Sequence, residues 1–190
     1  MLVIRKLDKN LDRFGDAIAV LGTSRTRQAL ARAVNRVGTT AKGRAIRDVT
    51  YQSSIPRQLV KQQIVYRRAT PGTLEGRIVA KGRPLSLKHF GALQLSYGVR
   101  AKVQRKLMRY LGAFMGPSPG VIAPKLGGHV FVRTTEKTWQ NGRRLPIEML
   151  FGPSVPEEMV KGRAAAQFER TVETMLPQRV EHELRRLLPK

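Results

Sequence analysis

Apolar residues recur with helical spacing at both ends of this 190-residue chain and with strand spacing between them. In residues 27–49 an apolar stripe returns every three or four positions, the period of an α-helix. Residues 92–104 alternate apolar and polar side chains, as a half-buried antiparallel strand or hairpin does. Because strands and helices do not alternate along the chain, a doubly wound parallel sheet is disfavoured. The sequence predicts an α+β fold, in which an antiparallel β-sheet packs against a long basic N-terminal helix and a long C-terminal helix.

A chain of this length suits one core. We therefore predict a single α+β domain over residues 1–190. Its parts are a helical region at 1–64, a mostly β region at 65–155 that contains a Gly/Pro-rich loop at 112–128, and a C-terminal helix at 156–188. No apolar run is long enough for a membrane span, so no membrane is expected. The acids of the N-terminal segment do not suit a signal peptide, and we do not expect secretion.

Positive charge is concentrated in the first three quarters of the chain. The formal net charge is +23. Residues 146–190 are neutral, with seven bases and seven acids, whereas residues 1–145 hold 29 bases and six acids. Residues 76–135 hold eleven bases and no acid. Self-repulsion on this scale destabilises a folded chain unless a polyanion or an acidic protein surface offsets it. The commonest such partner is nucleic acid.

Two sets of basic residues are candidates for contact with DNA or an acidic partner. In a helix over the first set, at about 100° per residue, the apolar stripe faces one way and the arginines face the other. The apolar stripe consists of Leu30, Val34, Val37, Ala41 and Ala45, and the first basic set of Arg25, Arg32, Arg36 and Arg47. The second set consists of Arg100, Lys102, Arg105 and Arg109. The alternative interpretation of each set is an ordinary solvated surface.

Catalytic and metal-binding motifs are not evident in the sequence. It contains no P-loop, HExxH or GxSxG pattern and no cysteine. His89, His129 and His182 lack metal-ligand spacing. Asp48 and Glu75 stand alone in a basic region, where each is expected to neutralise a neighbouring arginine rather than act as an acid/base pair. We predict no catalytic residue, no cofactor and no metal.

Several segments resemble, in order, those of the minor tail protein Z family of tailed bacteriophages and prophages. They are the arginine-rich helix "ALARAVNRVGTTAKGRAI", then "RPLSLKHFGA", "GVRAKVQ", "GAFM", "HVFVRT" and "RRLPIEMLFGPSVP". The proline-rich link at 112–128 is longer than the family pattern. The resemblance implies a structural virion protein, not an enzyme, that completes and stabilises a long tail and joins its upper end to the head connector.

The resemblance also implies partners and a place in the virion. The partners are further copies of the chain in a hexameric ring, the tail terminator and tail tube proteins, and the head-tail connector proteins. The place is the head-proximal end of the tail, with the host cytoplasm as the site of assembly. A ring there surrounds the channel through which DNA passes, so a basic face is expected to hold DNA through phosphates alone.

A segment rich in proline, "LPIEMLFGPSVP", is a candidate protein-docking loop, and the alternative is an ordinary core strand and turn. Its candidate residues are Leu145, Pro146, Phe151, Pro153 and Pro156. Two further functions stay open at the level of sequence. One is a free-standing, nonspecific nucleic-acid-binding protein, and the other is a metal-dependent nuclease that uses Asp48 or Glu75.

Overall fold

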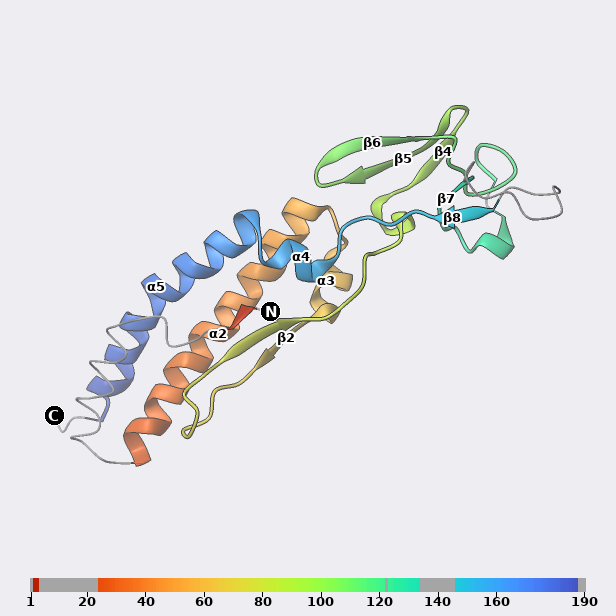
Figure 1. Ribbon diagram of the computed structural model, residues 1–190. Helices are drawn as coiled ribbons and strands as arrows, with labels where there is room; N and C mark the ends of the chain where they lie inside the picture. The colour runs from red at the N-terminus through yellow and green to blue at the C-terminus, as the bar shows by residue number, and fades with distance from the viewer. Residues whose placement is uncertain (1, 4–23, 122, 134–145, 188–190) are drawn as a thin grey trace. The chain divides into compact units, whose positions relative to one another are not determined.

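Helices and small antiparallel sheets make up the computed structural model, which describes residues 2–3, 24–121, 123–133 and 146–187 (Figure 1). The α+β prediction is confirmed. The helical elements are α2 (Ser24–Ser53), α3 (Arg57–Gln63), α4 (Val155–Met159), α5 (Gly162–Arg185) and the 3₁₀ turns η1 (Leu87–Phe90) and η2 (Pro124–Leu126). The strands are β1 (Leu2–Val3), β2 (Ile64–Arg67), β3 (Arg77–Ala80), β4 (Leu93–Leu95), β5 (Gly98–Val103), β6 (Lys106–Leu111), β7 (Phe131–Arg133) and β8 (Ile147–Met149).

The chain folds into two compact units, each assembled from segments far apart in sequence. Unit 1 consists of Met1–Val49, Arg57–Gly82 and Val155–Lys190, and unit 2 of Thr50–Pro56 and Arg83–Ser154. The boundary between the units therefore falls within α2, whose last turn groups with unit 2. A single domain over residues 1–190 stays a prediction.

The long helix α2 forms the centre of unit 1. Its predicted apolar stripe is confirmed, because Leu30, Val34, Val37, Ala41 and Ala45 are all buried. The helix contains two glycines, Gly38 and Gly43, and each lowers helix propensity by about 1 kcal/mol relative to alanine. At Gly38 this cost has a structural reason, since a Cβ there would lie 2.2 Å from Cζ of Tyr66. The glycine lets the ring of Tyr66 approach the helix axis.

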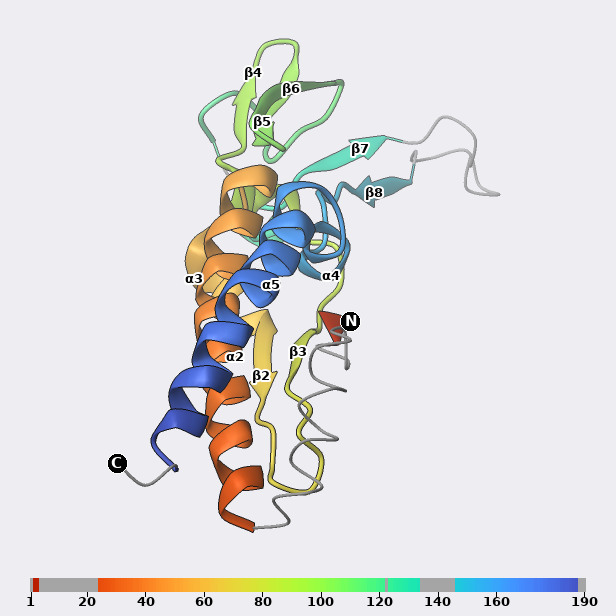
Figure 2. The ribbon, with the colours of Figure 1, turned by 90° about the vertical axis from the view of Figure 1, so that its left-hand side faces the viewer.

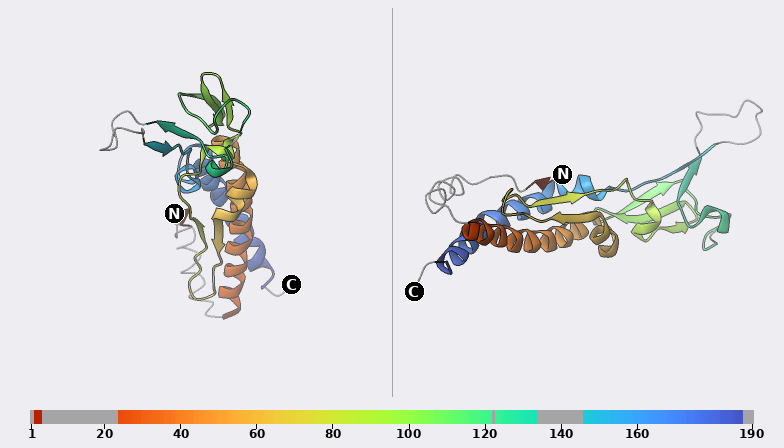
Figure 3. Two further views of the ribbon diagram at one scale, coloured as in Figure 1. Left: turned by 90° about the vertical axis from the view of Figure 1, so that its right-hand side faces the viewer. Right: turned by 90° about the horizontal axis from the view of Figure 1, so that it is seen from below.

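One side of α2 lies against a three-stranded sheet with the strand order β1-β3-β2. Strands β2 and β3 run along the helix, as two perpendicular views show (Figures 2 and 3). They pair antiparallel, with Tyr66 opposite Ile78. Asn35 on α2 fixes the chain after β2: its amide Nδ2 donates to the carbonyl of Ala69 (2.9 Å) and its Oδ1 accepts from the Ala69 N–H (2.8 Å). The same Oδ1 accepts a bond from the Tyr66 hydroxyl (3.0 Å).

The other side of α2 packs against α5, which lies beside it in both Figure 1 and Figure 2. The buried positions of α5 recur at helical spacing and include Ala164, Phe168, Val172, Leu176 and Val180. The prediction of one helix at 156–188 is wrong in one respect, because the helix is interrupted at Val160–Lys161 and divided into α4 and α5. Gly162 there has φ 62°, the left-handed region that favours glycine. Helix α5 continues through Pro177.

Unit 2 contains two separate antiparallel sheets. One has the strand order β4-β5-β6, and the other pairs β7 with β8. The period-two segment at 92–104 is a hairpin, with a turn at Ser96–Tyr97 between β4 and β5. Strands β7 and β8 fall in the predicted β region and pair antiparallel, with Val132 opposite Glu148. Residues 134–145 between them lie outside the described residues, as do residues 4–23 of the predicted helical region. The predicted helical region 1–64 ends one residue early, because Ile64 already begins β2.

The Gly/Pro-rich loop at 112–128 is anchored by one side chain of β4. Gln94 Oε1 accepts the N–H groups of Met115 (2.7 Å) and Gly116 (2.9 Å), and its Nε2 donates to the Gly116 carbonyl (3.3 Å). A Cβ at Gly116 would lie 1.8 Å from the Val121 carbonyl oxygen, so only glycine fits this turn. The loop therefore starts from a fixed point on the inner side of the sheet.

Candidate functional site

The first set of candidate arginines shares one exposed side of α2, as predicted. Arg25, Arg32, Arg36 and Arg47 are all exposed, and we call them the helix ridge. Gly43 falls on the same side, and a Cβ built there would meet no atom within 4 Å. The surface of α2 between Arg36 and Arg47 is therefore not covered by other described residues. Contact of the helix ridge with DNA or with an acidic partner stays a prediction.

Part of the charge of the helix ridge is offset within unit 1. Arg32 Nε donates to Glu183 Oε2 of α5 at 2.9 Å. Arg47 Nε lies 3.9 Å from Asp48 Oδ1, at the limit of an ion pair. Among the described residues, the recorded ion pairs include neither Arg25 nor Arg36. These two arginines are the part of the ridge with the largest uncompensated charge.

The two lone acids of the basic region each pair with an arginine, as expected. Asp48 is 1% exposed and accepts a bond from Arg163 Nε at 3.1 Å. Glu75 accepts two bonds from Arg77, at 2.9 and 2.8 Å. This bidentate contact raises the pKa of the Arg77 guanidinium above its usual value. Asp48 and Glu75 thus each bind an arginine side chain within unit 1.

The second candidate set divides into two groups in unit 2. Antiparallel register places directly opposed residues on the same side of a sheet. Arg100 is paired with Leu93 on β4 and with Arg109 on β6, and Lys102 is paired with Leu107. Arg100, Lys102 and Arg109 therefore share one face with leucines, and we call this the sheet face. It comprises Leu93, Arg100, Lys102, Leu107, Arg109 and Leu111.

Arg105 lies instead at the turn that joins β5 to β6. Gln104 and Arg105 have φ of 47° and 65°, a left-handed conformation that residues with a Cβ rarely adopt. Two bonds hold this turn: Gln104 N–H donates to the Ser53 carbonyl (3.1 Å), and Arg105 N–H donates to Ser54 Oγ (2.9 Å). The Arg105 guanidinium lies 4.1 Å from the centre of the Tyr51 ring. Such stacking fixes the direction of an exposed arginine.

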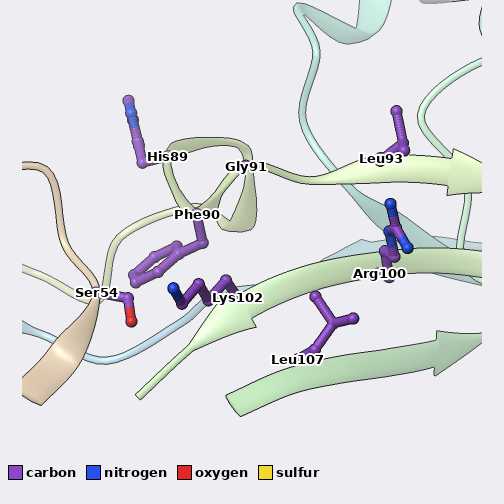
Figure 4. A pocket seen from close by; sticks show the side chains of 8 residues that line it. All are labelled: Ser54, His89, Phe90, Gly91, Leu93, Arg100, Lys102 and Leu107. Carbon is purple, nitrogen blue, oxygen red and sulfur yellow. The ribbon is translucent and has the colours of Figure 1, made fainter. Parts of the chain in front are cut away.

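A hollow of about 480 Å³ opens at one end of the sheet face (Figure 4). Its lining combines two cations of β5 with apolar groups, and consists of Ser54, His89, Phe90, Gly91, Leu93, Arg100, Lys102 and Leu107. Desolvation, Lys88 and His129 lower the pKa of the His89 imidazole. Lys88 Nζ donates to Nε2 of His129 at 2.9 Å, so the bond of 2.7 Å to Ser86 Oγ comes from a protonated Nδ1.

The candidate docking segment is fixed by backbone bonds, and one large side chain remains exposed. Gly152 N–H donates to the Leu85 carbonyl (2.7 Å), and Leu85 N–H donates to the Pro153 carbonyl (3.4 Å). Phe151, between them, is 51% exposed. Pro146, Pro153 and Pro156 are half-buried, and Leu145 lies outside the described residues. This rigid, exposed phenylalanine keeps the docking role open as a prediction.

Some residues of these surfaces were not foreseen from the sequence. Tyr51 and Tyr97, which stack on Arg105 and Arg109 (5.6 Å for the latter), carry no pattern of their own. Leu107 and Leu111 were detectable, because "KLMRYL" can pair with residues 98–103 across a two-residue turn. Within the described part of the chain, no group of three or more His, Asp or Glu side chains is placed to hold a metal. None of its helices has the length and apolar character of a membrane span.

Exposed cations on a helix, and cations alternating with leucines on a sheet, are the groups that can contact anionic and apolar surfaces of other macromolecules. The family model described as Prophage minor tail protein Z (GPZ) matches residues 14–190. The chain therefore belongs to this family, whose members are structural proteins of the phage tail. No curated protein and no solved structure matches it.

Proposed function

We propose that the protein completes and stabilises the tail, joins its upper end to the head connector, and turns the helix ridge toward the phosphates of the DNA in the channel. It acts by binding and not by catalysis, as one subunit of a ring with heterologous contacts between neighbours. Its partners are other virion proteins at the head-proximal end of the tail. Family membership supports the tail role, and the helix ridge supports the contact with DNA.

The observation that carries the DNA contact is the alignment of four exposed arginines on one side of α2. Among them, Arg25 and Arg36 take part in no recorded ion pair of the described residues. Sequence-independent binding to phosphates needs only such a row of cations. It also suits a channel, since base-specific contacts would hold the DNA at one position. An acidic protein neighbour is the other polyanion that fits this surface.

The test is binding of duplex DNA to the purified protein over a salt series. Each phosphate contact contributes about 0.9 to the slope of log K against log salt. Replacing Arg25, Arg36 and Arg47 with glutamine should therefore lower that slope by about 2 to 3. A matched triple at the C-terminal helix, with Arg170→Gln and Arg179→Gln on α5 and Arg186→Gln at its C-cap, should leave it nearly unchanged. An unchanged slope in the ridge variant would show that the helix ridge does not bind DNA.

Native mass measurement separates this proposal from a free-standing nucleic-acid-binding protein. A tail protein at the neck should assemble into a closed ring, alone or on tail proteins. A nonspecific DNA-binding protein should bind as a monomer or dimer without tail proteins. Labelled protein on intact particles, located by electron microscopy, tests the head-proximal position directly.

A further inference from the structure

The sheet face of unit 2 presents apolar and charged groups together. Its leucines are unusually exposed for a sheet, with exposed fractions of 46% for Leu93, 58% for Leu107 and 73% for Leu111. The opposite face of the same sheet is covered at β5, where Val99 and Ala101 are fully buried, while Met108 of β6 is 44% exposed there. Within the described part of unit 2, Leu107 and Leu111 therefore remain more than half exposed. Exposed apolar groups gathered on one face commonly mark a binding surface.

The cations of the sheet face lack acidic neighbours. Arg100 and Arg109 stand directly opposite each other on β5 and β6, and like charges in this position are destabilising. The described residues of unit 2 contain nine lysines and arginines and one acid, Glu148, which lies on β8 in the other sheet. Internal ion pairs therefore do not relieve the repulsion between Arg100 and Arg109. A carboxylate from another molecule, placed between them, would.

Strand β6 also has a free edge. The strand order β4-β5-β6 leaves its outer side without a strand partner among the described residues. A partner can extend such a sheet through main-chain hydrogen bonds while alternate side chains contact one face. A second copy of β6 is a poor occupant, since Lys106 and Arg109 would meet Lys106 and Arg109 of the copy. Charge complementarity favours an acidic strand.

From these features we infer that the sheet face binds an extended acidic segment of another virion protein, in which acidic and apolar residues take turns at every second position, so that both kinds lie on the same face of the added strand. The segment adds to the free edge of β6. Its apolar side chains cover Leu107 and Leu111 of β6, and its carboxylate between them meets Arg109, with Arg100 and Lys102 on the neighbouring strand β5 adding to the attraction. The hollow beside Phe90 accepts one anchoring side chain (Figure 4). DNA fits this face less well, because phosphate oxygens would leave the leucines without apolar partners.

This inference rests on the proposed function only for the identity of the partner as a virion protein, so its test uses probes of defined chemistry. The first probe is a short fluorescent peptide in which glutamate and valine take turns at every second position, with threonine between them. The second has the same sequence with glutamine in place of glutamate, and the third is a short DNA duplex. The full-length protein should bind the acidic peptide, with an affinity that falls as salt increases. The glutamine peptide should bind at least about tenfold more weakly.

Two variants locate the binding. Replacing Arg100, Lys102 and Arg109 with glutamine should weaken binding of the acidic peptide by at least about tenfold, while DNA binding stays within about twofold. The matched ridge triple, Arg25→Gln, Arg36→Gln and Arg47→Gln, should weaken DNA binding and leave binding of the acidic peptide nearly unchanged. Replacing Leu107 and Leu111 with serine should weaken the alternating peptide but not an all-glutamate peptide. All of these side chains except that of Arg100 are exposed, and circular dichroism verifies that each variant is folded.

The outcomes separate failure of this inference from failure of the proposed function. Unchanged peptide binding by the sheet variant overturns the inference, and so does an equal loss of DNA and peptide binding, which would make the sheet face a DNA surface. Loss of peptide binding in the sheet variant, together with no effect of the ridge variant on DNA, retains the inference and overturns the DNA contact of the helix ridge.

Discussion

Basic residues of unit 1 and of unit 2 have different neighbours. Among the described residues of unit 1, six arginines and lysines contact acids, as in Arg32–Glu183, Arg163–Asp48 and Arg77–Glu75. In unit 2 the arginines lie over aromatic rings, as in Arg105–Tyr51, Arg109–Tyr97 and Arg133–Phe114. The ion pairs recorded among the described residues all lie in unit 1, and the recorded cation–π contacts all lie in unit 2.

This difference indicates two uses of the same residue types. An acid beside an arginine neutralises it and links two elements of the fold. An aromatic ring holds an arginine in place but leaves its charge intact. The paired charges of unit 1 therefore link elements of unit 1, whereas Arg25 and Arg36 of the helix ridge take part in no such pair among the described residues. The charges of unit 2 remain available to a partner.

The largest expected effect is on the buried acid of unit 1. Arg163→Met removes the closest cation of Asp48, whose second oxygen, Oδ2, already lacks a hydrogen-bond partner among the described residues. A buried carboxylate left in this way should lower the free energy of unfolding by about 2–3 kcal/mol. Urea denaturation followed by circular dichroism measures it. The double variant that also carries Asp48→Asn no longer has the buried charge, so it should regain most of the lost stability.

The control is Arg185→Met, which removes an exposed pair with Glu181 on the same helix. Arg185→Met should lower the free energy of unfolding by only about 0.4 kcal/mol, as is usual for exposed pairs of this spacing. If Arg163→Met costs no more than Arg185→Met, charge pairing does not stabilise unit 1, and the contrast with unit 2 is lost.

The next effect compares two glycines of α2. Gly38→Ala should destabilise unit 1 by about 1–2 kcal/mol, because the new methyl group overlaps the ring of Tyr66. The ring has little room to move away, since Gly76 also lies close to it: a Cβ built at Gly76 would be 2.3 Å from the Tyr66 hydroxyl oxygen. Gly43→Ala is the matched control, and it should stabilise the helix by about 0.5–1 kcal/mol. Stabilisation by both variants would show that the close approach to Tyr66 is dispensable.

A pair of charge removals should change stability in opposite directions. Arg32→Gln breaks the contact with Glu183 and should lower the free energy of unfolding by about 0.5 kcal/mol. Arg100→Gln removes the like-charge pair with Arg109 and should raise the stability of β5 and β6 by about 0.3 kcal/mol. Circular dichroism follows the first and amide exchange of β5 and β6 the second, in low salt. Both differences should diminish at high salt, and equal signs would contradict the comparison.

The smallest effect is a pH dependence in unit 2. The pKa of His89 is lowered from 6.5 by desolvation, Lys88 and His129, so the unfolded chain binds more protons than the folded one between the two pKa values. The contribution of His89 to stability is full above pH 6.5 and is lost as the pH falls through the folded pKa. His89→Gln should flatten this slope, measured by amide exchange in β4 after correction for intrinsic rates. His182→Gln in α5, as a control, should not.

The sequence predicted the helical framework well, because helical periodicity is a local property. Leu30, Val34 and Val37 were assigned to a buried face from spacing alone, and the arginines of the helix ridge to the opposite side. The α+β class followed from the order of the elements. These predictions needed no knowledge of which segments meet.

Features that depend on long-range contacts were not predictable in this way. The turn at Gln104–Arg105 has no glycine or asparagine, and its left-handed conformation is held by Ser53 and Ser54, fifty residues earlier in the chain. The pairing of Arg100 with Arg109 follows from that turn. The interruption before α5 was missed because Gly162 lies inside an otherwise helical pattern.

Asn35 has a consequence for how the helix ridge is positioned. Apolar side chains alone would allow α2 to slide along the sheet by one helical turn, exchanging one small residue for another. The amide of Asn35 meets both backbone groups of Ala69 and the hydroxyl of Tyr66 at a single alignment. A shift of α2 would break all three bonds at once. The amide thereby sets the longitudinal position of each guanidinium group along unit 1, so any partner of α2 meets the same spacing of charges in every copy.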